Sequence, residues 1–222
     1  MDWTALGVSL WLGAGTIALL LPFGIWLGRL LAFRQFRGKL LVEALVTVPL
    51  VLPPTVLGFY LLVTFGGRSA LGEAFHAVVG QSLAFSFEGL LLASAIANIP
   101  FVVQPIQRAF EAIPADVRDA ASCCGLTPWQ RFVRVEVPLA WPGILTAAVL
   151  AFAHTLGEFG VVLMVGGNLP GETRTLSVAI YDRMNAFDDR SAGVMAATLL
   201  VTAVATLMLT AALSRQVVPR RG

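Results

Sequence analysis

His154 and Glu158 are the two residues of this 222-residue chain whose types and spacing come closest to supporting chemistry. They lie four positions apart in an apolar segment, so a helix would place both on one face within hydrogen-bonding reach. A catalytic zinc site needs three protein ligands, and the order here is not His-Glu-x-x-His, so we predict no metal site. We interpret the pair either as a polar lock inside a helix bundle or as part of a gate that faces a second subunit.

A cluster of prolines is the second unusual feature. Pro49, Pro53 and Pro54 fall within six residues of another apolar segment. Each proline lacks a backbone N–H and clashes with the preceding turn, so we expect a kink or a break in this helix. Broken helices occur in membranes where they line a cavity or pack within protein. Pro53, Pro54 and Thr55 are therefore candidate pathway residues, and a simple packing kink is the alternative.

Other motifs that carry chemistry are missing from the sequence. It has no G-x-x-x-x-G-K-[ST] phosphate loop and no nucleophile elbow, so we expect no catalytic residues and no ATP hydrolysis by this chain. Cys123 and Cys124 have no partner at a redox or metal-binding spacing, so we expect them to pack as small buried side chains. The dense basic runs that nucleic-acid binding requires are also missing.

Composition places the chain in a membrane. Apolar residues make up 57% of it, charged residues 13%, and the mean hydropathy is +0.82. Five stretches of 19 to 26 residues carry no charge, and about 20 residues are enough to cross a bilayer as a helix. We therefore predict an all-α integral membrane protein with one transmembrane domain over residues 1–222. Its spans are expected near residues 3–32, 41–66, 87–108, 137–166 and 191–214.

Basic residues predict the orientation. Eleven of the fifteen lie on one side of the predicted spans: Arg29, Arg34, Arg37, Lys39, Arg108, Arg118, Arg131, Arg134, Arg215, Arg220 and Arg221. The positive-inside bias assigns this side to the cytoplasm. The N-terminus is then outside and the C-terminus inside, as five spans require.

The polar loop over residues 109–136, between spans three and four, carries helix signals. Its small and apolar residues recur with helical spacing, at Val117, Ala120, Ala121 and Cys124. Gly125 suits the left-handed end of that helix, and Thr127 with Gln130 can form a capping box for a second one. We predict a short helix, a glycine turn and a second helix that leads into span four, with Ala120 and Ala121 open to a partner.

This loop resembles the Glu-Ala-Ala loop of binding-protein-dependent ABC importer permeases. The family pattern is Glu-Ala-Ala, three residues, Gly, nine residues, Ile-x-Leu-Pro. The chain has Asp119-Ala120-Ala121, then Gly125, then Val135-Glu136-Val137-Pro138 at the same spacing. Asp119 departs from the family glutamate but keeps its charge. The series Gly157-Glu158-Phe159-Gly160, Gly167-Asn168, Gly171-Glu172-Thr173 and Ile180-Tyr181 is similar to molybdate ABC transporter permeases along nearly the whole chain, and sulfate permeases share it more loosely.

The resemblance implies a homodimeric permease of the bacterial inner membrane that imports molybdate. Two cytoplasmic ATPase subunits, which bind the ATP and Mg²⁺, are expected to grip the loop; this chain itself holds no cofactor. The implied coupling residues are Asp116, Arg118, Asp119, Ala120, Ala121, Gly125 and Leu126. An extracytoplasmic molybdate-binding protein is expected to dock on outer loops that include Asn168, Glu172 and Arg174.

Two alternatives stay open at this point. The same class of transporter would carry sulfate, thiosulfate or tungstate with the same overall pattern. A different class, an ion-driven secondary transporter or a membrane enzyme, would use His154 and Glu158 and would work without an ATPase. Secondary transporters often contain inverted repeats, and none is evident in the sequence.

Overall fold

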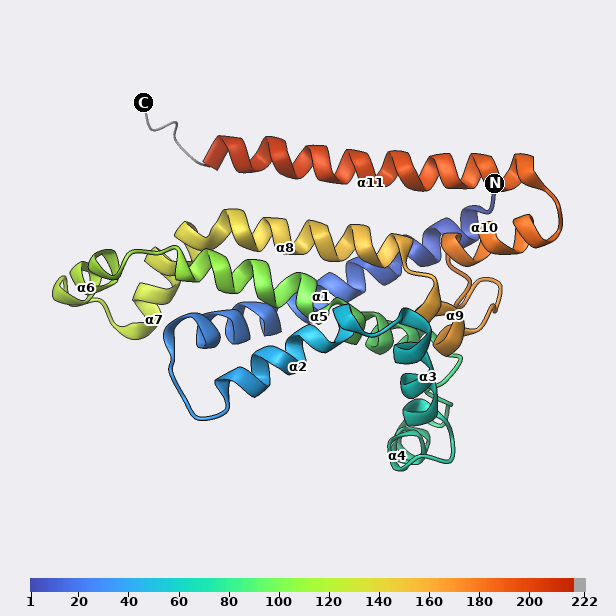
Figure 1. Cartoon of the computed structure of the whole chain (residues 1–222), viewed down its shortest axis with the longest axis horizontal. Helices are drawn as coiled ribbons and strands as arrows, with labels where there is room; N and C mark the ends of the chain where they lie inside the picture. The colour runs from blue at the N-terminus through green and yellow to red at the C-terminus, as the bar shows by residue number, and fades with distance from the viewer. Residues whose placement is uncertain (218–222) are drawn as a thin grey trace.

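The computed structural model describes the backbone of residues 1–217 and the side chains of residues 1–208, and helices are its only regular secondary structure over that range. Three long helices form its core: α1 (Trp3–Phe33), α5 (Phe87–Glu111) and α8 (Val137–Gly157). They lie side by side along the long axis of the molecule (Figure 1). Their facing surfaces bury a cluster of aliphatic and aromatic side chains that includes Val102, Ile106, Phe110, Ile144 and Ala147.

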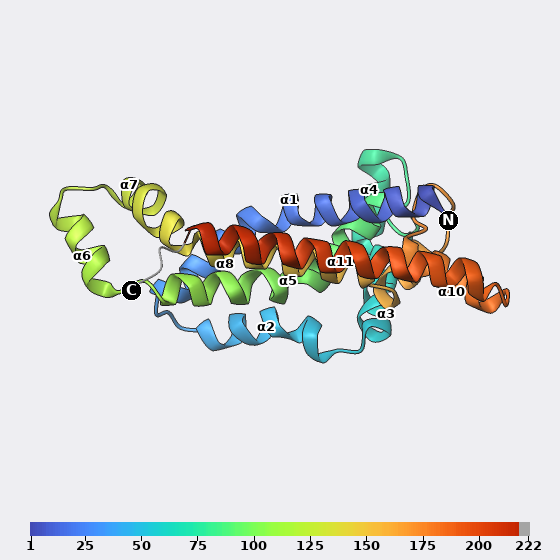
Figure 2. The same cartoon turned by 90° about the horizontal axis from the view of Figure 1, so that it is seen from above.

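The last helix, α11 (Asp189–Val217), packs along α8 and against α10 (Leu176–Asn185). Seen from above, α11 runs parallel to the core helices (Figure 2). Only a small part of its apolar surface is buried within the chain, as expected for a helix that faces lipid or another subunit. Arg220 and Arg221, which the sequence assigns to the cytoplasm, lie outside the described residues, as does the side chain of Arg215.

The second predicted span is bent. The sequence predicts one helix over 41–66, whereas the structure has α2 (Lys39–Val51) and α3 (Pro54–Phe65), which meet at 110°. Pro53 and Pro54 cause this break, because their missing N–H groups cannot continue the hydrogen bonds of α2. α3 and the short α4 (Ala70–Val79) project away from the core (Figure 1).

The fourth predicted span is also interrupted. The sequence predicts a helix over 137–166, but α8 ends at Gly157 and a short helix, α9 (Gly160–Gly166), follows. Glu158 between them has an extended backbone, with φ −67° and ψ 129°. Four helical segments of the described chain are therefore long and apolar enough to cross a membrane, and the bent α2–α3 pair provides a fifth if it counts as one span.

The polar loop forms one end of the molecule. It contains α6 (Ala115–Cys123), α7 (Pro128–Arg131) and the π-helical turn η1 (Phe132–Glu136), which joins α8. The N-terminus lies at the other end, near α10 (Figure 1). We call the end with α6 the cytoplasmic end and the opposite one the outer end, because the basic residues predict that orientation.

Candidate functional site

The loop at the cytoplasmic end is a pair of helices whose ends are closed by hydrogen bonds. The Cys124 N–H donates to the Ala120 carbonyl at 3.0 Å, and Gly125 then adopts φ +76°. The second helix starts with a complete capping box: the Gln130 N–H donates to Thr127 Oγ1 at 3.3 Å, and the Thr127 N–H donates to Gln130 Oε1 at 2.9 Å. The helix, glycine turn and second helix predicted from the sequence are thus present.

The seven predicted coupling residues differ in their exposure to solvent. Four are exposed on or beside α6: Asp116, Asp119, Ala120 and Gly125. Arg118 and Leu126 are half-buried, and Ala121 is buried in the chain itself. The prediction that Ala120 and Ala121 both face a partner is therefore wrong for Ala121. Cys123 and Cys124 are exposed, so the expectation that they are buried is also wrong.

Arg118 points back into the protein, toward a carboxylate that sequence reasoning missed. Glu136 is completely buried and accepts from three arginines: Arg29 Nε at 2.5 Å, Arg131 Nε at 3.2 Å and Arg118 Nε at 3.4 Å. Arg131 also donates to Ser122 Oγ at 2.7 Å. The cluster ties the end of α1 to both loop helices and to the start of α8.

Glu136 owes its position to the π-helical turn. A π turn adds a residue to the helix, and such turns are frequent at functional sites. In the sequence Glu136 occupies the variable position of the Ile-x-Leu-Pro element, so the family pattern alone assigns it no role. The signal that could have revealed it is its charge, since it is the acidic residue nearest in the sequence to Arg131 and Arg134, two of the predicted cytoplasmic arginines.

At the outer end, Glu158 holds together the break between α8 and α9. Its Oε1 accepts the Val161 N–H at 2.9 Å and so caps α9, and its backbone carbonyl accepts from the Ser177 hydroxyl at 2.7 Å. The other carboxylate oxygen lies 3.7 Å from His154 Nε2. These contacts give Glu158 a structural role within one subunit. A gating role would require a facing subunit.

His154 joins a buried polar chain across the core helices. Its Nδ1 is 3.2 Å from Asn98 Oδ1, and the Asn98 amide donates to Thr155 Oγ1 at 3.0 Å. Thr16 and Ser94 extend the chain through a hydroxyl contact of 3.0 Å. Among the described residues no buried side-chain nitrogen or oxygen lacks a partner. These groups therefore satisfy one another within the bundle.

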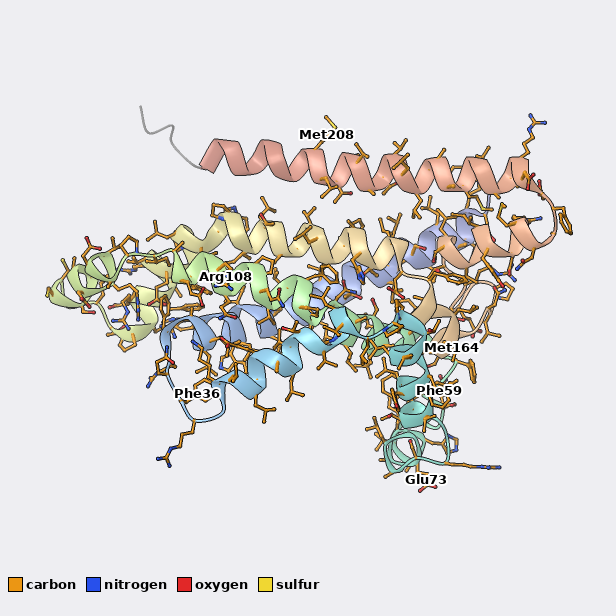
Figure 3. The ribbon with its side chains drawn as sticks, in the orientation of Figure 1. Phe36, Phe59, Glu73, Arg108, Met164 and Met208 are labelled. Atoms are coloured by element: carbon orange, nitrogen blue, oxygen red, sulfur yellow. The ribbon has the colours of Figure 1, made fainter. Side chains whose placement is uncertain are left out.

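The two broken spans meet each other. A Cβ on Gly160, at the start of α9, would lie 2.8 Å from Pro54 Cβ, at the start of α3. Gly58 approaches Met164 just as closely, and Figure 3 shows Met164 on α9 beside Phe59 on α3. The candidate pathway residues at the proline break are thus in contact with the segment that Glu158 caps, although Pro53, Pro54 and Thr55 are themselves exposed.

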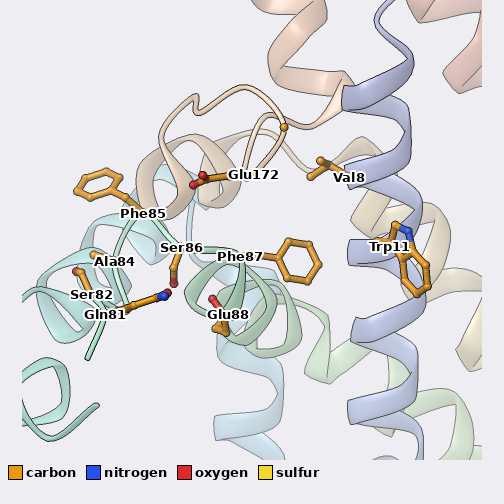
Figure 4. A pocket seen from close by; sticks show the side chains of 11 residues that line it. Val8, Trp11, Gln81, Ser82, Ala84, Phe85, Ser86, Phe87, Glu88 and Glu172 are labelled. Atoms are coloured by element: carbon orange, nitrogen blue, oxygen red, sulfur yellow. The ribbon is translucent and has the colours of Figure 1, made fainter. Parts of the chain in front are cut away.

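The predicted docking residues of the outer loop have two different environments. Asn168 Oδ1 accepts from Arg174 Nε at 2.6 Å, and Asn168 Nδ2 donates to Asp182 Oδ2 at 2.6 Å, so these residues fix the loop to α10. Glu172 is exposed instead and lines an outer cavity of about 740 Å³ together with Glu88 (Figure 4). Of the three docking candidates, Glu172 is the most available to a partner.

Both the sequence and the structure of this chain match those of known transport proteins. The family model described as "Binding-protein-dependent transport system inner membrane component" matches residues 21–221. The chain belongs to this family. It is a permease subunit, a multi-pass protein of the bacterial inner membrane.

Relatives of this permease are named as molybdenum or as sulfate transport proteins. The molybdenum transport system permease protein ModB of Azotobacter vinelandii is 49% identical over 84% of this chain and 83% of the relative. The probable sulfate transport system permease protein cysT of Chlorella vulgaris is 33% identical over 84% of this chain and 70% of the relative. Among solved structures, an inward-facing MetNI methionine ABC transporter matches with a TM-score of 0.74 at 18% identity, over 98% of this chain and 94% of that one, and so shares the fold.

Proposed function

We propose that this permease moves molybdate through the inner membrane, after delivery by an extracytoplasmic binding protein and with energy from ATP hydrolysed in separate subunits. The observation that supports molybdate as the transported ion is the 49% identity to a molybdenum permease, compared with 33% to a sulfate permease. ATP and Mg²⁺ would be bound by the partner subunits and not by this chain.

The structure of α6 supports a coupling role. The helix sits at the extreme cytoplasmic end (Figure 2) and exposes Asp116, Asp119 and Ala120. Two carboxylates beside a small side chain suit a partner groove that is basic and approaches the helix closely. Arg118 on the opposite side links the helix to Glu136. A movement imposed on α6 would therefore reach α1 and α8 through the buried ion cluster.

The projection of α3 and α4 supports pairing with a second copy. These helices leave the core, and α3 exposes Phe59, Tyr60 and Val63. In a membrane, a helix with large exposed apolar side chains faces either lipid or another subunit, and its projection from the core suits the second. The two breaks at Pro54 and Glu158 would then lie beside the subunit interface, where a gate between copies is expected.

The outer cavity supports docking of a binding protein more than cargo binding. Its carboxylates, Glu88 and Glu172, would repel an oxyanion but can pair with lysines or arginines of a protein surface. Selectivity for molybdate would then reside mainly in the binding protein, with a weakly binding route through the permease.

Substitution of Ala120 tests the coupling surface. Ala120→Arg places a large cation on the exposed face of α6, so we expect loss of the copurifying ATPase and of uptake, with the permease still in the membrane. Ala112→Arg is the matched control, because Ala112 is also exposed at this end but lies outside α6. Equal ATPase retention in the two variants would contradict the coupling role of α6.

Competition with anions tests the cargo and the class of transporter. The complex is reconstituted with its binding protein, and uptake of labelled molybdate is measured with excess tungstate, sulfate or thiosulfate. We expect tungstate to compete and sulfate and thiosulfate not to compete. Preferential uptake of sulfate would show that sulfate, and not molybdate, is the transported ion. Uptake that persists without any ATPase and resists vanadate would instead establish the secondary-transporter alternative.

A further inference from the structure

A cavity of about 1080 Å³ lies at the cytoplasmic end, between the last turns of α1 and the loop helices. One part of its wall is apolar and comes from α1, at Leu21, Pro22, Ile25 and Leu30. The other part is basic and comes from four arginines, Arg29, Arg34, Arg118 and Arg131. None of the functions proposed above uses this cavity.

The cavity has an excess of positive charge. Among the described residues, no carboxylate lines it, and the acidic side chain that pairs with its arginines is Glu136, buried behind Arg29, Arg118 and Arg131. Four guanidinium groups and one carboxylate leave three positive charges. Within the described part of the chain, Arg34 makes no ion pair. Arg29, Arg118 and Arg131 are half-buried and Arg34 is exposed at the rim, so this excess favours an anionic ligand that enters from the surface.

The arginines also keep free hydrogen-bond donors. Arg29 and Arg118 each reach Glu136 with Nε, and no other hydrogen bond from either guanidinium is made to a described residue. The Arg118 guanidinium carbon lies over the Phe33 ring, 3.6 Å from the ring centroid. Guanidinium groups fixed in this way present their terminal N–H groups to a phosphate, which they bind in a bidentate manner.

The cavity lies at the border between hydrocarbon and headgroups. α1 carries no charged residue from Trp3 to Gly28, and Arg29 is its first cation. Two tryptophans line the cavity and are largely exposed, Trp26 at 60% and Trp129 at 70%. Tryptophan is enriched at this depth of the bilayer. At this depth the apolar wall would face acyl chains, and the arginines would face phosphates.

We propose that this cavity binds an anionic phospholipid of the cytoplasmic leaflet, with its phosphate on the arginines and an acyl chain along the apolar wall of α1. Basic pockets beside membrane helices on the cytoplasmic side have this chemistry. The lipid would contact both α1 and the arginines that hold the coupling loop, so lipid charge would influence the position of α6.

The test uses the full-length permease, with any subunits that copurify, in vesicles of phosphatidylcholine and phosphatidylglycerol. Quenching of tryptophan fluorescence by brominated phosphatidylglycerol is compared with quenching by brominated phosphatidylcholine. Arg34→Gln is the informative variant because the Arg34 side chain makes no ion pair with any of the described residues. Arg37→Gln is the matched control, since Arg37 is exposed three residues away and does not line the cavity.

We expect wild type and Arg37→Gln to prefer phosphatidylglycerol to a similar extent, and Arg34→Gln to lose about ten-fold of that preference, the size of one lost hydrogen bond to a charged group. Equal losses in both variants would indicate diffuse surface charge and overturn the proposal. So would the absence of any preference, as expected if a second copy or the ATPase covered the cavity. Displacement of the lipid by excess inorganic phosphate would show a free-anion site instead, and would equally overturn it.

Discussion

At the scale of single residues, the most consequential side chain is Glu136. It is fully buried, yet the three arginines around it keep between 22% and 32% of their side-chain surface in solvent. The carboxylate is therefore satisfied inside the protein, while the cations remain partly hydrated. This asymmetry means that removal of the acid and removal of one arginine have different consequences, because only the acid has no access to water.

We predict that Glu136→Gln destabilises the cytoplasmic end. Breaking a buried ion pair typically costs roughly 3–5 kcal/mol, and the partial hydration of the arginines places the expected loss near or below the lower value. The thermal midpoint should fall, and the coupling loop should become sensitive to limited proteolysis. Glu111→Gln is the control, because Glu111 pairs with a largely exposed Arg108 at 2.9 Å and should contribute only about 0–1 kcal/mol. Similar shifts for both variants would contradict a special role for Glu136.

At the scale of elements, the contact between α3 and α9 is the feature that organises the outer end. Each helix follows a break, one at the prolines and one at Glu158, and the two pack with almost no space between their backbones. Helices that approach through glycine interlock tightly, and an added methyl group must displace a neighbour. The pair should therefore behave as one unit.

We predict that Gly160→Ala impairs uptake by forcing α9 away from α3. Its new Cβ would lie 2.8 Å from Pro54 Cβ and 3.3 Å from the Thr55 backbone nitrogen. Overpacking of this kind costs about 1–3 kcal/mol. Gly157→Ala is the matched control, because a Cβ there meets nothing within 4 Å. Uptake and the thermal midpoint are measured for both, and equal behaviour would show that the close approach is unimportant.

At the scale of the whole molecule, what the sequence predicts well depends on the range of the interactions. The coupling loop is predictable because Gly125, Thr127 and Gln130 act within a few residues. The break at Glu158 is not predictable, since the apolar helix signal continues through it. The cap that Glu158 forms also depends on how α9 and Ser177 pack. The Glu136 cluster is equally hidden, because its arginines come from three separate segments. Local chemistry could be read from the sequence, whereas contacts between distant segments required the fold.

The orientation of the whole molecule can be tested with its native cysteines. The chain has two, Cys123 and Cys124, and both are exposed at the end with α6. If that end faces the cytoplasm, a membrane-impermeant maleimide should label inside-out vesicles and spare right-side-out ones. In a Cys123→Ser, Cys124→Ser background, Ala74→Cys on exposed α4 should show the opposite pattern. Labelling of the native cysteines in right-side-out vesicles would show that the protein has the opposite orientation.

The buried ion cluster also has a consequence for how the protein is made. Arg29 is separated from Glu136 by 107 positions, so α1 has long left the ribosome before its carboxylate partner is synthesised. Until then Arg29 has no counter-ion at the membrane surface, whereas Arg118 and Arg131 are synthesised only 18 and 5 positions before Glu136. The cluster therefore closes only when the first and fourth helical spans have been inserted side by side. A nascent chain that fails to bring them together would display an unanchored loop, which is a ready substrate for the proteases that remove misassembled membrane proteins.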